Sequence, residues 1–135
     1  MKRWLTSWLV VMLIFAVIDA AWIAGVVLPM YRAELGTAMS QSLDPVAALA
    51  FYMIFTAGIT AYGVAPGSKR RLRDHAQRGA LYGFFTYATY ALTLKVILAT
   101  SWTLALSDIA WGVFVSSLTS AVAALILTIL RTEAE

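Results

Sequence analysis

The feature that most constrains this chain is a set of four segments that stay apolar around their whole helical circumference. They cover residues 4–28, 45–64, 79–98 and 102–130. A bilayer core is about 30 Å thick and a helix rises about 1.5 Å per residue, so each segment is long enough to cross it. Charged residues make up only 13% of the chain, against about 25% in an average soluble domain. The sequence therefore predicts one all-α domain over 1–135, a four-helix transmembrane bundle.

Polar connections agree with these spans. Asp44 followed by Pro45 is a helix-start signal, because the aspartate caps free amides and proline is tolerated in the first turn. Residues 65–68 contain proline and glycine and are expected to end the second span. We expect a short interfacial helix at 31–35, and irregular backbone inside a span only near 25–29.

Positive side chains predict the orientation. They gather before the first span, between the second and third, and after the fourth, while only Arg32 and Lys95 belong to the other side. Because cytoplasmic loops are enriched in lysine and arginine, we expect both termini in the cytoplasm. The basic loop is expected to contact anionic lipid, with a specific protein or nucleotide partner as the alternative. The residues expected to touch lipid are Lys69, Arg70, Arg71 and Arg73.

Three ionisable side chains fall inside the spans, all in the outer half: Asp19, Lys95 and Asp108. A charge in a span costs at least about 2.5 kcal/mol near the bilayer centre, so each needs a partner or a purpose. The simplest hypothesis pairs Lys95 with Asp108, Asp19 or both. The alternative is that Lys95 extends to the interface and Asp108 starts its helix in water.

The same phrase occurs twice, as Asp19-x-x-Trp22 in the first span and Asp108-x-x-Trp111 in the fourth. Residues three apart share a helix face, and the two spans run in opposite directions, so the phrases are expected to face each other inverted. They form either a proton- or cation-responsive carboxylate pair or a polar clamp that fixes helix register. Two tyrosines on one face of the third span reach this acidic group or simply pack in the core. The predicted intramembrane polar cluster is Asp19, Trp22, Tyr87, Tyr90, Lys95, Asp108 and Trp111.

Small residues recur every fourth position on three spans and predict close helix packing. The pattern does not say whether the partner is another span, a second copy or a different protein. The packing residues are Ala16, Ala20 and Ala24 on the first span, Gly79 and Gly83 on the third, and Gly112, Ser116, Ser120 and Ala124 on the fourth.

Several of these features together resemble a group of small bacterial four-span proteins, the domain-of-unknown-function family 2177. The resemblance covers nearly the whole chain and implies an inner-membrane location, the four-span fold and no agreed reaction. It rests on Asp19-x-x-Trp22, Tyr31 with Leu35-Gly36, Phe51-Tyr52 and Gly58, Gly83 with Tyr87 to Tyr90, and Asp108-x-x-Trp111-Gly112.

One stretch departs from the family pattern. The family has Tyr-Asp-Leu-Thr-Asn in the third span, where this chain has Tyr90-Ala91-Leu92-Thr93-Leu94. Two polar groups are therefore missing. If the family's activity depends on a third intramembrane carboxylate, this chain has kept only the scaffold.

The leading functional expectation is a non-enzymatic accessory subunit that packs against other integral membrane proteins or a second copy. In a phototroph, a light-harvesting and reaction-centre core is one candidate partner. The alternative is a small transporter of a cation, proton or lipid that uses Asp19 and Asp108. A lipid-modifying enzyme ranks third, because the single histidine, His75, is expected in a solvated loop and the chain has no cysteine. No cofactor, metal or nucleic acid is expected; lipids are the other expected contacts.

Overall fold

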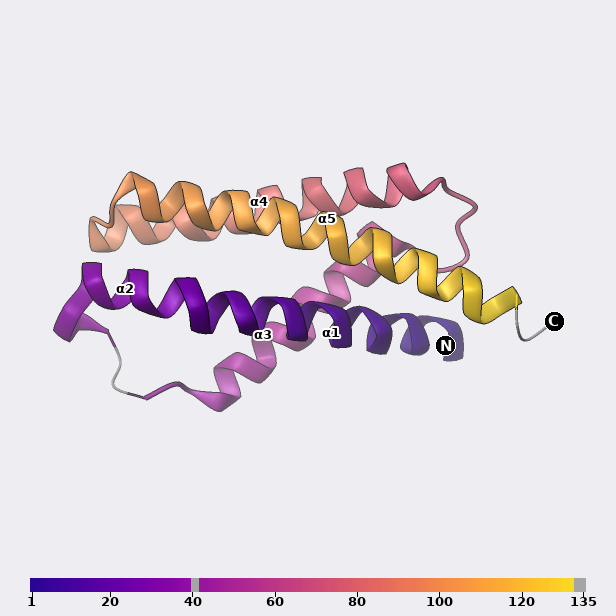
Figure 1. Ribbon diagram of the computed structural model, residues 1–135, viewed down its shortest axis with the longest axis horizontal. Helices are drawn as coiled ribbons and strands as arrows, with labels where there is room; N and C mark the ends of the chain where they lie inside the picture. The colour runs from indigo at the N-terminus through magenta and orange to yellow at the C-terminus, as the bar shows by residue number, and fades with distance from the viewer. Residues whose placement is uncertain (40–41, 133–135) are drawn as a thin grey trace.

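The computed structural model describes residues 1–39 and 42–132, and every regular element within them is a helix. The helices form four long rods; the first, third and fourth run along the molecule, and the second crosses them obliquely (Figure 1). Each rod is long and apolar enough to cross a membrane, and the rods span Lys2–Ala38, Pro45–Val64, Leu72–Leu98 and Trp102–Thr132. The predicted all-α, four-helix fold is confirmed.

Two of the rods contain π-helical segments. The first consists of α1 (Lys2–Trp22), the π-helical η1 (Ile23–Val27), α2 (Leu28–Leu35) and the 3₁₀ turn η2 (Gly36–Ala38). The second rod consists of α3 (Pro45–Gly58) and the π-helical η3 (Ile59–Val64), and the last two are α4 (Leu72–Leu98) and α5 (Trp102–Thr132).

The first rod does not end at the expected residue 28 but continues to the end of α2, so residues 31–35 extend this rod instead of forming a separate interfacial helix. Pro29 explains the irregularity predicted near 25–29. A proline inside a helix cannot donate to the residue four before it, and its ring clashes with that carbonyl. The wider π turn of η1 precedes Pro29, which falls in the first turn of α2.

Side-chain caps set the other boundaries. The Asp44 carboxylate accepts hydrogen bonds from the amides of Val46 at 2.9 Å and Ala47 at 3.1 Å, which confirms the predicted helix start. Ala65, at φ 44°, ends η3 in the left-handed region. Helix α4 begins seven residues before the expected 79, because Asp74 accepts from the Arg71 amide at 3.1 Å and caps a charged first turn.

The amino end of α1, the carboxyl end of α5 and the connection 65–71 lie at one end of the molecule, at the right of Figure 1. The opposite end holds α2 and the turn between α4 and α5. The basic segments therefore share one end, as the placement of lysine and arginine predicted.

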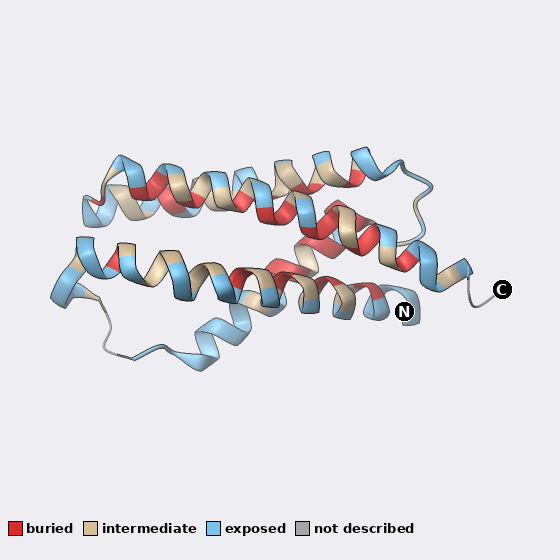
Figure 2. Cartoon of the chain, in the orientation of Figure 1, coloured by how far each residue is buried: buried red, intermediate tan, exposed pale blue. Residues whose placement is uncertain are grey.

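The buried core is contributed by three of the rods. It centres on Val11 and Phe15 of α1, Ile59 of η3, and Val115 and Leu127 of α5. Figure 2 shows buried positions on the facing sides of the helices and exposed positions outside. Large apolar side chains fill much of that outside surface among the described residues, as expected where lipid replaces water.

The most extensive helix contact joins α4 and α5, and the predicted small residues form it. A Cβ added to Gly83 would meet the backbone of Gly112, and one added to Gly79 would meet the backbone of Ser116 and the side chain of Ser120. Ala124 is also buried. The small residues of these two spans therefore pack against each other within one chain.

The small-residue row of the first span lies differently. Ala16 is partly buried, but Ala20 and Ala24 are exposed. Next to them, a Cβ added to Gly25 would meet nothing within 4 Å. This row therefore stays open on the outside of the described fold.

Candidate functional site

Asp19 is buried at the centre of a hydrogen-bonded group drawn from several rods. Only 2% of the residue is exposed. Its Oδ1 accepts from the Trp111 indole of α5 at 3.0 Å, and its Oδ2 accepts from the Tyr52 hydroxyl of α3 at 3.2 Å. Tyr87 of α4 lies next to the same carboxyl. Both oxygens of Asp19 are therefore occupied by donors from within the chain.

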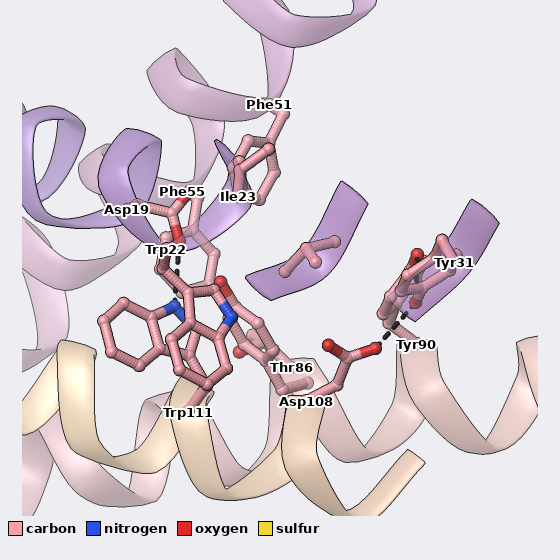
Figure 3. A pocket seen from close by; sticks show the side chains of 12 residues that line it. Asp19, Trp22, Ile23, Tyr31, Phe51, Phe55, Thr86, Tyr90, Asp108 and Trp111 are labelled. Carbon is pink, nitrogen blue, oxygen red and sulfur yellow. Dashed lines mark hydrogen bonds between the residues drawn. The ribbon is translucent and has the colours of Figure 1, made fainter. Parts of the chain in front are cut away.

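Asp108 on α5 forms a second polar group toward the α2 end of the molecule. Its Oδ2 accepts from the Tyr31 hydroxyl at 2.6 Å. The same hydroxyl lies 3.1 Å from the Tyr90 hydroxyl of α4. In Figure 3 one oxygen of Asp108 receives this bond and the other receives none.

The repeated phrases meet in inverted order, as predicted, but they are not equivalent. The Trp22 and Trp111 rings stack with centroids 4.2 Å apart and planes within 5°. Trp111 donates to Asp19, whereas the Trp22 Nε1 is buried and has no hydrogen-bond partner among the described residues. Asp108 accepts from Tyr31 where strict symmetry requires Trp22.

A cavity of about 450 Å³ lies between the rods and joins the two polar groups. This volume is within the range of about 300–1,000 Å³ typical of small-molecule sites. Most of its wall is apolar, and Figure 3 shows side chains from all four rods around it. The lining residues are Asp19, Trp22, Ile23, Val27, Tyr31, Phe51, Phe55, Thr86, Tyr87, Tyr90, Asp108 and Trp111.

Lys95 does not belong to this site, and its expected ion pair with Asp19 or Asp108 is not formed. Its ammonium donates to the Thr100 carbonyl at 2.6 Å and lies 4.8 Å from the centre of the Trp102 ring. The long side chain thus reaches the turn at the end of its own helix. The alternative expectation for Asp108, a helix start in water, is wrong, because Asp108 is only 6% exposed.

The site contains two tyrosines that the predicted intramembrane polar cluster did not include. Tyr31 and Tyr52 donate to the two carboxyls; Tyr31 was expected in an interfacial helix, and Tyr52 was noted only as part of a family resemblance. The available signal was their hydroxyl groups on otherwise apolar rods, since a buried tyrosine hydroxyl usually finds a partner.

The basic end of the molecule holds four exposed cationic side chains and a buried histidine. Lys69, Arg70, Arg71 and Arg73 are exposed, and their contact with anionic lipid stays a prediction. His75 is not a solvated loop residue: it lies in α4, is 6% exposed, and its Nδ1 lies 3.0 Å from the Gly63 carbonyl oxygen. It therefore joins α4 to η3.

The charge of the cavity follows from its lining. Asp19 and Asp108 line it, and no lysine, arginine or histidine does. Trp111, Tyr52 and Tyr31 donate to these two carboxyls. A positively charged group inside the cavity would compensate these carboxylates.

Residues 4–125 match the family described as "Predicted membrane protein (DUF2177)". No curated protein and no solved structure matches the chain.

Proposed function

The chain belongs to the DUF2177 family of predicted membrane proteins, and from this premise we propose that it binds a small positively charged molecule inside the membrane and carries it. The family makes the protein a multi-pass membrane protein, and its description names no reaction. The function therefore has to be argued from the cavity.

One observation supports the proposal: two carboxyls line one cavity with no cationic side chain beside them. An isolated charge at this depth costs at least about 2.5 kcal/mol, and more if water is excluded. A bound cation would compensate these carboxyls in their ionised form and so offset the cost of ionising them inside the membrane. Lys95, the expected counter-charge, is bound elsewhere.

The experiment is a cation screen on the purified protein. Ligand binding at about 100 times Kd stabilises a fold by about 2.7 kcal/mol, so a thermal shift detects it. Sodium, potassium and tetramethylammonium are screened against the wild type, Asp19→Asn and Asp108→Asn. Asp44→Asn is the matched control, because asparagine caps a helix as well as aspartate and position 44 lies outside the cavity.

We expect at least one cation to stabilise the wild type and the control, with less stabilisation in both cavity variants. The proposal fails if no cation has an effect, or if all four proteins respond equally. Counterflow of the stabilising cation in proteoliposomes then tests whether binding leads to transport.

We also propose that both termini lie in the cytoplasm of a bacterial inner membrane. The support is the excess of positive charge at the end of the molecule that holds both termini. Because the chain has no cysteine, single cysteines at exposed positions report the side directly. Thr37→Cys should react with an impermeant maleimide in spheroplasts and Lys69→Cys should not; the opposite result would invert the orientation.

A second candidate is an accessory subunit that packs against another membrane protein. The observation that favours it is the open row of Ala20 and Ala24 beside Gly25 on the outside of the first rod, since small residues allow close helix approach. A light-harvesting and reaction-centre core stays one predicted partner. Mild detergent extraction of wild type and Ala24→Leu tests this: the wild type should migrate in a larger complex that the variant loses, and a monomer in both would exclude it.

A further inference from the structure

We infer that the molecule carried in the cavity is an amphiphile with an organic ammonium head and an apolar chain. This inference rests on the proposed function and names the ligand class for the same site. The two carboxyls explain a preference for positive charge. The nature of the remaining walls decides which kind of positive charge fits.

Aromatic rings make up much of the wall. The stacked Trp22 and Trp111, together with Phe51, Phe55 and Tyr87, line the cavity. An ammonium group within about 6 Å of such a ring is attracted by its face, by about 2 kcal/mol where water is excluded. Aromatic walls therefore suit an organic cation that sheds its water easily.

A metal cation fits the same walls poorly. Hard cations such as calcium take about six to eight oxygen ligands. Among residues 1–39 and 42–132, no group of three or more histidine, cysteine, aspartate or glutamate side chains is placed to hold a metal ion. Asp19 is further occupied by Trp111 and Tyr52.

The hydrogen bonds place the head at the Asp108 side of the cavity. Among the side chains drawn in Figure 3, only Tyr31 donates to Asp108, at one of its two oxygens, whereas both Asp19 oxygens accept from donors. Asp108 is thus the charge partner, and Asp19 is a positioning residue that orients Trp111.

The apolar part of the cavity accommodates the chain of the amphiphile. Ile23 and Val27 of η1 form one wall. Phe51 and Tyr90 also line the cavity, although they are 38% and 52% exposed. The cavity therefore reaches the outer surface of the helices between α3 and α4. In a spanning protein that surface faces lipid, so a chain can extend into the bilayer.

The test compares a cationic series with neutral isosteres in micelles of an uncharged detergent. Butyl-, octyl- and dodecyltrimethylammonium are titrated against the wild type, and each is paired with the analogue in which carbon replaces the nitrogen. Tryptophan fluorescence and thermal shift report binding. We expect saturable binding that is about tenfold tighter for the cation than for its isostere, about 1.4 kcal/mol, and that tightens with chain length.

Variants then assign the roles. Asp108→Asn should abolish the difference between cation and isostere, Asp19→Asn should weaken both probes together, and Asp44→Asn should change neither. The comparison of the two probes on the wild type needs no variant, so it stands even if Asp108→Asn does not fold.

Equal binding of cation and isostere, or no effect of chain length, would overturn the inference. Binding of sodium or potassium that depends on Asp108, with none of the ammonium series, would overturn it while leaving the proposed function intact. Absence of binding by every cation would remove both.

Discussion

Gly83 lies in the contact between α4 and α5, and replacing it with alanine tests how that contact is built. The added Cβ would meet the backbone carbonyl of Gly112 and the side chain of Ser116 at separations that real Cβ atoms do not reach. Backbone atoms cannot rotate away, so the two helices would have to separate. Overpacking of this kind costs about 1–3 kcal/mol.

Gly25→Ala is the matched control, because a Cβ there meets nothing within 4 Å. Both substitutions make the same chemical change in a helix, so their difference isolates the steric term. Reversible unfolding by titration with a denaturing detergent, followed by helical circular dichroism, measures it. We expect Gly83→Ala to be less stable than Gly25→Ala by about 1–3 kcal/mol. Equal stability of the two would refute the close approach of α4 and α5.

Three further predictions concern single side chains. Tyr31→Phe removes the hydrogen bond to the Asp108 carboxylate and should lower the unfolding free energy by about 1.5–3 kcal/mol. The control is Tyr62→Phe, at an exposed ring, which should leave the unfolding free energy unchanged in the same titration. Trp22→Phe should weaken the exciton signal of the stacked indoles in circular dichroism, whereas Trp102→Phe should keep it; an unchanged signal in both would show that the rings do not stack. Lys95→Gln should lower the unfolding free energy by no more than about 1.5–3 kcal/mol, the contribution of one hydrogen bond with a charged donor, because its partner is a carbonyl. A loss of about 3–5 kcal/mol would instead indicate that Lys95 forms a buried ion pair with a carboxylate.

The four rods were predictable because a long apolar run has few alternatives in a bilayer, but their ends were not. The segment 72–78 is rich in charge, so an apolar criterion leaves it out, yet Asp74 caps it and it continues the helix of the third span. Residues 31–35 were expected to form a separate interfacial helix, because the stretch after residue 28 is more polar than the span before it. Helix propensity and side-chain capping extend a helix past the end of its apolar run, and a prediction from hydropathy does not include these effects.

The site was predictable in part. The repeated aspartate and tryptophan phrase indicated that Asp19 and Trp111 would meet, because antiparallel helices place such phrases opposite each other. Tyr52 was missed because a span that is apolar on every side gives no period from which to find its inward face. Lys95 was misplaced because a local carbonyl five residues ahead satisfies its ammonium without a carboxylate.

The π turn at Ile23–Val27 sets which way Tyr31 points. Tyr31 is twelve residues after Asp19, and at about 100° per residue an unbroken α-helix would set the two about 120° apart around the axis. A π turn takes up one residue without advancing the helix, which reduces the angle to about 20°. Asp19 and Tyr31 consequently look into the same cavity. Deleting one residue from this segment would rotate the rest of the first rod about its axis by about a quarter turn. The set of side chains that lines the cavity therefore depends on the length of this segment as much as on its sequence.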